Sequence, residues 1–135
     1  MLQRQIQQIK ARLSLRTPQA EALDILADVL ETMEFSKETD VAAALETIKA
    51  TYPTVTDFER DFPSLCFALA TGVGKTRLMG AFIAYLYLTG RSKHFFILAP
   101  NTTIYTKLVA DFSQQNSPKY VFRGIAEFAQ LPPHR

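Results

Sequence analysis

The feature that most constrains this chain is a short loop that joins an apolar run to a helical pattern. The loop reads Leu69-Ala70-Thr71-Gly72-Val73-Gly74-Lys75-Thr76. Its spacing is that of the pattern G-x-x-x-x-G-K-[ST], except that Leu69 stands in place of the first glycine. In that pattern the backbone N–H groups wrap a polyphosphate, and glycine allows the backbone to approach it closely. Residues 69–76, called the P-loop below, therefore predict a site for nucleotide phosphates.

The chemistry of the P-loop assigns roles to its positions. Lys75 supplies a positive charge for the β- and γ-phosphates, and the Thr76 hydroxyl is expected to ligate Mg²⁺. A helix that follows the loop directs its N-terminal N–H groups toward the phosphates. The predicted cofactors are ATP and Mg²⁺, and the predicted nucleotide-binding residues of the loop are Thr71, Gly72, Val73, Gly74, Lys75 and Thr76.

Apolar runs on both sides of the P-loop favour an α/β fold. Residues 64–69 and 94–99 are short and apolar, which suits fully buried strands, and residues 120–122 suit the start of a third. Helical patterns over residues 75–89 and 102–115 separate these runs, and Gly90 is expected to end the first of these helices. Because strand–helix–strand order implies parallel pairing, we expect a parallel sheet.

The part of the chain before residue 61 shows helical patterns only. Residues 1–13 are rich in glutamine and carry a narrow apolar stripe, which fits either a helix packed on this domain or a docking helix for a partner. The next helix is expected to begin after the N-cap Thr17 and to run to about Met33. A third helix is expected after a cap at Asp40 or Thr39.

Composition excludes several classes of protein. The single cysteine, Cys66, rules out a disulfide framework or a cysteine metal cluster, and we expect it to be buried in a strand. The longest apolar run, residues 79–88, is too short to span a bilayer, and no signal peptide is seen. A cytoplasmic location without a membrane partner is therefore expected. A net charge of +2 is too mild to indicate nucleic-acid binding by itself.

Two further motifs flank the P-loop. Upstream, Arg16 and Gln19 lie three residues apart at a helix start, and a glutamine amide can pair with the edge of adenine. Downstream, an apolar run ends in Pro100-Asn101-Thr102, whose position at a helix start can hold a phosphate. Taken singly, an exposed glutamine and an ordinary helix cap are the favoured explanations of these two motifs.

Taken in order, the three motifs resemble the Q-like motif, motif I and motif Ia of superfamily-2 helicases. The chain is most similar to the DEAD/DEAH-type ATPase of type III restriction enzymes, the Res subunit, over residues 14–124. The resemblance is carried by the sequence Leu-Ala-Thr-Gly-Val-Gly-Lys-Thr, followed by Leu-Ala-Pro-Asn-Thr-Thr. The resemblance implies an incomplete RecA-like sheet in which Gln19, aided by Arg16, reads adenine. It implies ATP-driven movement along duplex DNA and a modification subunit as a partner. The residues that it places along the DNA path are Pro100, Asn101 and Thr102.

The resemblance also implies a division of the chain and a limit on its chemistry. Residues 1–60 are expected to form a helical region with the Q-like motif, and residues 61–135 the first part of a truncated RecA-like domain. Hydrolysis of ATP needs an acid that holds Mg²⁺, a group that orients water and usually an arginine finger. After Thr76 the only acids are Asp111 and Glu127, and neither lies in an Asp-Glu pair, so no catalytic residue is assigned. We expect an N-terminal fragment of a DNA helicase or translocase that binds ATP without appreciable turnover.

The sequence is compatible with two other hypotheses about the function of the chain. A small P-loop kinase is one, although such kinases usually carry the loop near the N-terminus, and here residues 1–68 precede it. Phosphoryl transfer to an acceptor would favour that reading. The other is a non-enzymatic assembly piece that acts through residues 1–13 or exposed sheet edges. A stable complex that is insensitive to Lys75→Ala would favour it.

Overall fold

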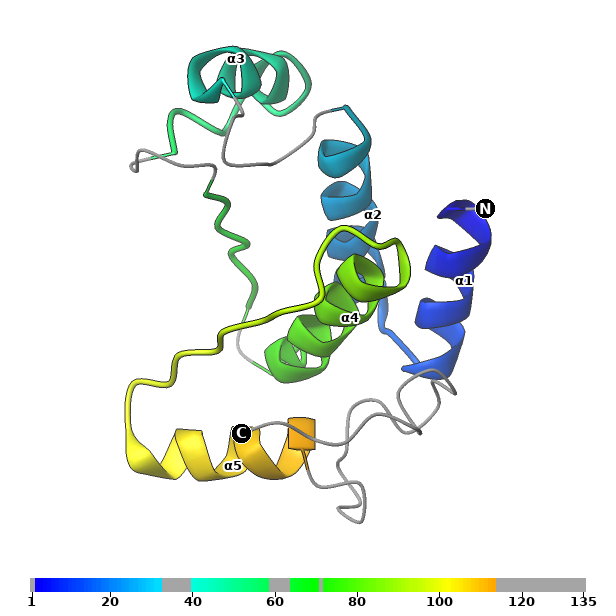
Figure 1. Ribbon diagram of the computed structural model, residues 1–135, viewed down its shortest axis with the longest axis vertical. Coiled ribbons are helices and arrows are strands. Elements are labelled where there is room, and N and C mark those ends of the chain that lie inside the picture. The colour runs from blue at the N-terminus through cyan, green and yellow to red at the C-terminus, as the bar shows by residue number, and fades with distance from the viewer. Residues whose placement is uncertain (1, 33–39, 59–63, 71, 114–135) are drawn as a thin grey trace.

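The computed structural model of the chain describes residues 2–32, 40–58, 64–70 and 72–113. Within these ranges the chain forms five α-helices (Figure 1). None of these helices is long and apolar enough to cross a membrane. Their bounds are α1 Leu2–Arg12, α2 Thr17–Thr32, α3 Val41–Thr51, α4 Lys75–Leu88 and α5 Thr102–Ser113.

Helices α1, α2 and α4 pack together around the main core of the described fold (Figure 1). The apolar stripe of α1 faces inward, since Ile6, Ile9 and Leu13 are at most 2 % exposed. This helix is therefore an amphipathic helix of the domain, the first of the two alternatives for residues 1–13. Burying one large apolar side chain stabilises a fold by about 1.5–3 kcal/mol. The other buried members of the main core are Ala22, Leu23, Leu26, Ala27, Leu30, Leu78, Ala81, Ala84 and Tyr85.

The ends of the helices follow local sequence signals. Asp40 is the N-cap of α3, and its carboxylate accepts hydrogen bonds from two N–H groups of the first turn, which confirms one of the two predicted caps. Helix α4 ends as predicted at Gly90, which has a φ of +73°. Two backbone bonds from Gly90 and Arg91 back to the last turn close this end as a Schellman motif.

A second, smaller core joins α3 to the far half of α2. Its buried residues are Val29, Ala44, Ile48 and Phe58. At its edge the Tyr52 hydroxyl donates a 2.7 Å hydrogen bond to the Asp28 carboxylate on α2. That bond, together with desolvation and the negative charge of Asp28, raises the pKa of Tyr52 from 10.0 to about 12. The hydrogen bond thus links α3 to α2 while the phenol is protonated.

The Tyr52–Asp28 pair predicts an alkaline stability change. The folded-state pKa of Tyr52 lies above the unfolded value, so its contribution is complete below about pH 10 and is lost as the pH rises toward 12. At about pH 11 an ordinary tyrosine is mostly ionised and Tyr52 is not. In an ultraviolet titration, Asp28→Ala is expected to add one tyrosinate to the absorbance at that pH. Equal tyrosinate absorbance in the wild type and the variant would contradict the assignment.

The expected parallel sheet is wrong for the part of the chain that the structure describes. Segments 64–70 and 93–99 are extended, the first leading into the P-loop and the second joining α4 to α5 (Figure 1). Neither segment forms backbone hydrogen bonds with another extended segment among the described residues. A β-strand is defined by such hydrogen bonds to a neighbouring strand. The predicted strand at residues 120–122 lies outside the described residues.

Burial differs between the two extended segments. The side chains of segment 64–70 that contact the main core alternate along the chain and are Leu65, Phe67 and Leu69. Cys66 lies between them and is exposed, so the prediction of a buried cysteine is wrong. In segment 93–99, Phe96 is 88 % exposed and Leu98 is 77 % exposed. The apolar composition that suggested buried strands does not reveal how many faces of a segment are covered.

Candidate functional site

The P-loop leads from the extended segment 64–70 directly into α4. Gly72 and Gly74 both have a φ of +86°, in the left-handed region where an L side chain is strained. Gly74 is the N-cap of α4, and Lys75 is the first residue of the helix. The backbone therefore accounts for glycine at both positions. Thr71 lies outside the described residues.

The start of α4 gathers groups that suit a polyphosphate. The first N–H groups of an α-helix have no acceptor within the helix and form the positive end of its dipole. In this turn Lys75 is exposed and Thr76 is half-buried, as is Val73 in the loop. A Cβ atom built on Gly72 would meet no atom of the other described residues within 4 Å, so the described part of the loop is open there. Amide, ammonium and hydroxyl groups together fit ATP with Mg²⁺.

Gln19 connects the start of α2 to the P-loop. The side chain is 2 % exposed, and its Nε2 donates a 2.8 Å hydrogen bond to the carbonyl oxygen of Gly74. The same carbonyl also accepts the 3.1 Å bond from the Leu78 N–H that opens α4. The structure thus brings together two motifs that are 55 residues apart in the sequence.

The other end of the Gln19 amide caps its own helix. Its Oε1 accepts a 2.8 Å hydrogen bond from the backbone N–H of Arg16. The Arg16 carbonyl accepts the first helical bond, from Ala20, so α2 begins at Thr17 and the predicted N-cap role of Thr17 is wrong. A glutamine three residues after the cap that reaches back to the cap N–H is half of a capping box. The sequence analysis noted the same spacing of three residues but interpreted it as a site for adenine and not as a cap.

Arg16 forms a second, weaker link between α2 and the loop. Its Nη1 donates a 3.4 Å hydrogen bond to the carbonyl oxygen of Gly72, and the side chain is exposed. Arg16 and Gln19 therefore hold the carbonyls of both loop glycines. The predicted reading of adenine by these two residues is not tested by the structure and stays a prediction.

Arg77 is a residue that sequence reasoning missed. Its guanidinium lies in the first turn of α4 and donates a 2.9 Å hydrogen bond from Nη1 to the carbonyl oxygen of Leu13, just beyond α1. A cation at the C-terminal end of a helix is favourable because the carbonyls there carry partial negative charge. No spacing rule links position 77 to position 13, so only the fold reveals this contact.

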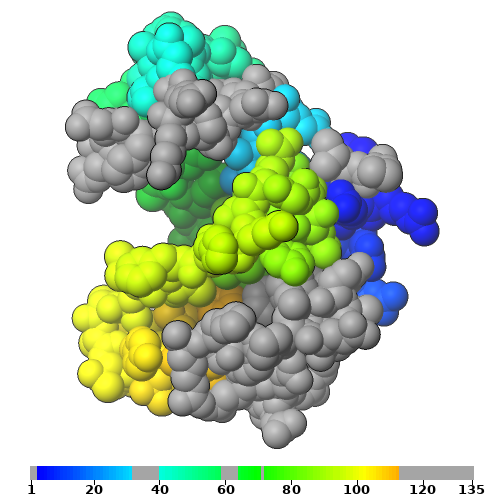
Figure 2. All heavy atoms as spheres, in the orientation of Figure 1, coloured from blue at the N-terminus to red at the C-terminus, as the bar shows by residue number. Residues whose placement is uncertain are grey.

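The residues predicted to lie along DNA form the start of α5. The Asn101 side chain accepts a 2.9 Å hydrogen bond from the Ile104 N–H, which confirms a cap at this helix start. Pro100, Asn101 and Thr102 are exposed. The part of the chain around residue 100, drawn in yellow, lies on the surface in Figure 2. Among the described residues no hydrogen bond joins them to the P-loop. Their contact with DNA stays a prediction.

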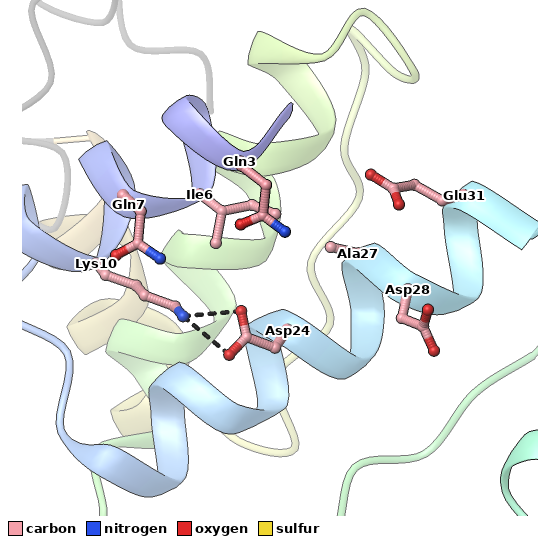
Figure 3. Close-up of a pocket in the computed structure, with 8 residues that line it drawn as sticks. All are labelled: Gln3, Ile6, Gln7, Lys10, Asp24, Ala27, Asp28 and Glu31. Carbon is pink, nitrogen blue, oxygen red and sulfur yellow. Dashed lines mark hydrogen bonds and ion pairs between the residues drawn. The ribbon is translucent and has the colours of Figure 1, made fainter. Parts of the chain in front are cut away.

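Away from the P-loop, a hollow lies between α1 and α2, with a volume of about 300 Å³ (Figure 3). Lys10 spans it and contacts both carboxylate oxygens of Asp24 at 2.8 Å. Within the described ranges no three His, Cys, Asp or Glu side chains are placed to hold a metal ion, in this hollow or elsewhere. Asp111, one of the two acids after the P-loop, is buried in α5.

Comparison with known protein families gives a match over most of the chain. Residues 12–130 match the family described as "Type III restriction enzyme, res subunit". The match includes the Gln19 motif, the P-loop and the start of α5. No curated protein and no solved structure matches the chain.

Proposed function

Because the chain belongs to the family of type III restriction enzyme Res subunits, we propose that it binds the triphosphate of ATP through the P-loop. The observation that supports this most is the left-handed turn from Gly72 to Gly74, which ends at the N-terminus of α4. In the proposed complex the N–H groups of that turn donate to the phosphates. Lys75 places its ammonium against the β- and γ-phosphates.

The metal proposal concerns Thr76 on the same turn. Its hydroxyl is proposed as the protein ligand of Mg²⁺, with phosphate oxygens as further ligands. Bound Mg²⁺ would neutralise phosphate charge. Thr76 is the second residue of α4 and is half-buried.

The wider role follows from membership of a family of helicase-like ATPases of restriction systems. We propose that the protein acts in ATP-dependent movement on duplex DNA together with a modification subunit. In this proposal the start of α5, residues 100–102, lies along the DNA backbone. Its exposure and its position at a helix N-terminus support that placement.

The proposal predicts that Lys75→Ala lowers the affinity of the chain for MgATP by about ten- to hundredfold, since a charge-assisted contact to phosphate is lost. The measurement is isothermal titration calorimetry of the purified chain. Lys49→Ala is the matched control, because Lys49 lies on α3 and, among the described residues, makes only a surface ion pair with Glu46 at 3.7 Å. Equal affinities for wild type and Lys75→Ala would contradict the proposal, as would a wild type that binds no MgATP.

A further inference from the structure

We infer that Arg77 is a positioning residue that ties the first turn of α4 to the C-terminal end of α1, so that packing of α1 and binding of nucleotide favour one another. The inference rests on the proposed function, because the first turn of α4 is part of the proposed phosphate site. It starts from one bond: the Arg77 Nη1 donates at 2.9 Å to the carbonyl oxygen of Leu13, which is 64 residues earlier in the chain.

The C-terminal end of α1 leaves a carbonyl group for Arg77. Ser14 has a φ of +50°, in the left-handed region that commonly follows the end of a helix. The N–H groups of Ser14 and Leu15 bond back to carbonyls of the last turn of α1, at 3.2 and 3.0 Å. The carbonyl of Leu13 is not one of these two, and a carbonyl at a helix end needs a partner from outside the helix. The Arg77 guanidinium provides that partner.

The first turn of α4 carries a surplus of positive charge. It contains Lys75 and Arg77 and no acidic residue, and it is also the positive end of the helix dipole. This arrangement is unfavourable until negative charge lies nearby. The carbonyl of Leu13 offers Arg77 a partial negative charge, since it lies just past the C-terminal end of α1. Packing of α1 therefore relieves part of the repulsion in the turn that is proposed to bind phosphate.

Helix α1 is held to α4 at both ends. The two helices run in opposite directions (Figure 1), and the Gln5 Nε2 donates a 3.1 Å hydrogen bond to the carbonyl oxygen of Leu88, the last residue of α4. Between the two bonds the apolar stripe of α1 is buried in the main core. Of the two bonds, the one from Arg77 lies at the P-loop end of α4.

The link between α1 and α4 makes two equilibria interdependent. A bound triphosphate is proposed to fix the first turn of α4, and the Arg77 bond holds the same turn against α1. If packing of α1 raises the affinity for MgATP by some factor, bound MgATP must favour packing of α1 by the same factor. Local release of α1 exposes its backbone amides to hydrogen exchange, so the exchange rates report this packing.

The test measures hydrogen exchange of the backbone amides in the full chain, with and without MgATP, together with the affinity for MgATP by calorimetry. Any bound ligand slows the exchange that occurs through global unfolding. Helix α3, which belongs to the second core, is therefore the internal reference. In the wild type we expect MgATP to slow the amides of α1 by a factor about three to ten times larger than the factor for α3.

Arg77→Met removes the donors of the side chain and keeps most of its length. We expect it to weaken binding of MgATP about three- to tenfold, because the bond that is coupled to binding is lost. At the same multiple of the dissociation constant, MgATP is then expected to slow α1 and α3 by equal factors. Arg4→Met removes the same kind of side chain from the exposed face of α1. This control is expected to change neither the affinity nor the difference between the two helices.

Three outcomes would overturn the inference while the proposed function stands. Equal slowing of α1 and α3 in the wild type would show that packing of α1 is not coupled to nucleotide binding. Weaker binding by Arg77→Met, with the difference between α1 and α3 retained, would show that Arg77 acts as a charge near the phosphates. A lower melting temperature with unchanged affinity would show a purely structural link.

Failure of the proposed function itself has a separate signature. A wild type that binds no MgATP in the calorimeter would overturn that function, and the inference with it. If Arg77→Met does not fold, Arg77→Gln, which is shorter and keeps a polar end, replaces it with the same expected results.

Discussion

Replacing Leu23 with alanine is expected to lower the free energy of unfolding by about 2–5 kcal/mol. Leu23 lies on α2 and is 0 % exposed within the main core, where α2 meets α1 and α4. The truncation removes buried methyl groups and leaves a cavity that the three helices cannot fully close. The measurement is urea denaturation followed by circular dichroism.

Ile25 provides the matched control for this prediction. It lies two residues further along the same helix and is 37 % exposed. Ile25→Ala makes a comparable truncation with less buried surface, so we expect a loss of about 1 kcal/mol or less. If the two variants lose the same stability, the packing of α2 against α1 and α4 is not as described here.

Replacing Gly74 with alanine is expected to cost about 1–2 kcal/mol more stability than replacing Gly72 with alanine. Both glycines have a φ of +86°. Both substitutions therefore force an L residue into the left-handed region, which costs about 1–2 kcal/mol. They differ in their surroundings, because a Cβ on Gly74 overlaps Gln19 Nε2, whereas one on Gly72 has no atom of the other described residues within 4 Å. The extra cost reflects overpacking and the loss of the Gln19 hydrogen bond.

A double variant separates the two parts of the Gly74 effect. In a Gln19→Ala background the overlap is gone, so Gly74→Ala is expected to cost no more than Gly72→Ala costs in the wild type. Chemical denaturation of the four variants measures this difference. Gly72→Ala and Gly74→Ala with equal cost in the wild-type background would mean that Gln19 does not lie against Gly74.

The parts of the fold that the sequence predicted are local ones. Helix positions depend on caps and apolar spacing within one segment, which is why Asp40 and Gly90 were identified as helix ends. The glycines of the P-loop are local too, because their left-handed backbone is a property of the turn itself.

Apart from the cap of α2, the parts that were missed depend on partners distant in the chain. An extended segment becomes a strand only when another strand lies beside it, and among the described residues segments 64–70 and 93–99 have none. Likewise, spacing alone could suggest that Gln19 matters but could not show that its amide meets the Gly74 carbonyl. The contact from Arg77 to Leu13 carried no sequence signal at all.

The central claim is that the turn from Gly72 to Thr76 binds the phosphates of a nucleotide. The most direct measurement is a nuclear magnetic resonance titration of the ¹⁵N-labelled chain with MgATP, which follows each backbone amide. The amide signals of Gly72, Gly74, Lys75 and Thr76 are expected to shift together along one binding curve, while those of α3 stay in place. Shifts confined to other parts of the chain, or no shifts at saturating MgATP, would contradict it.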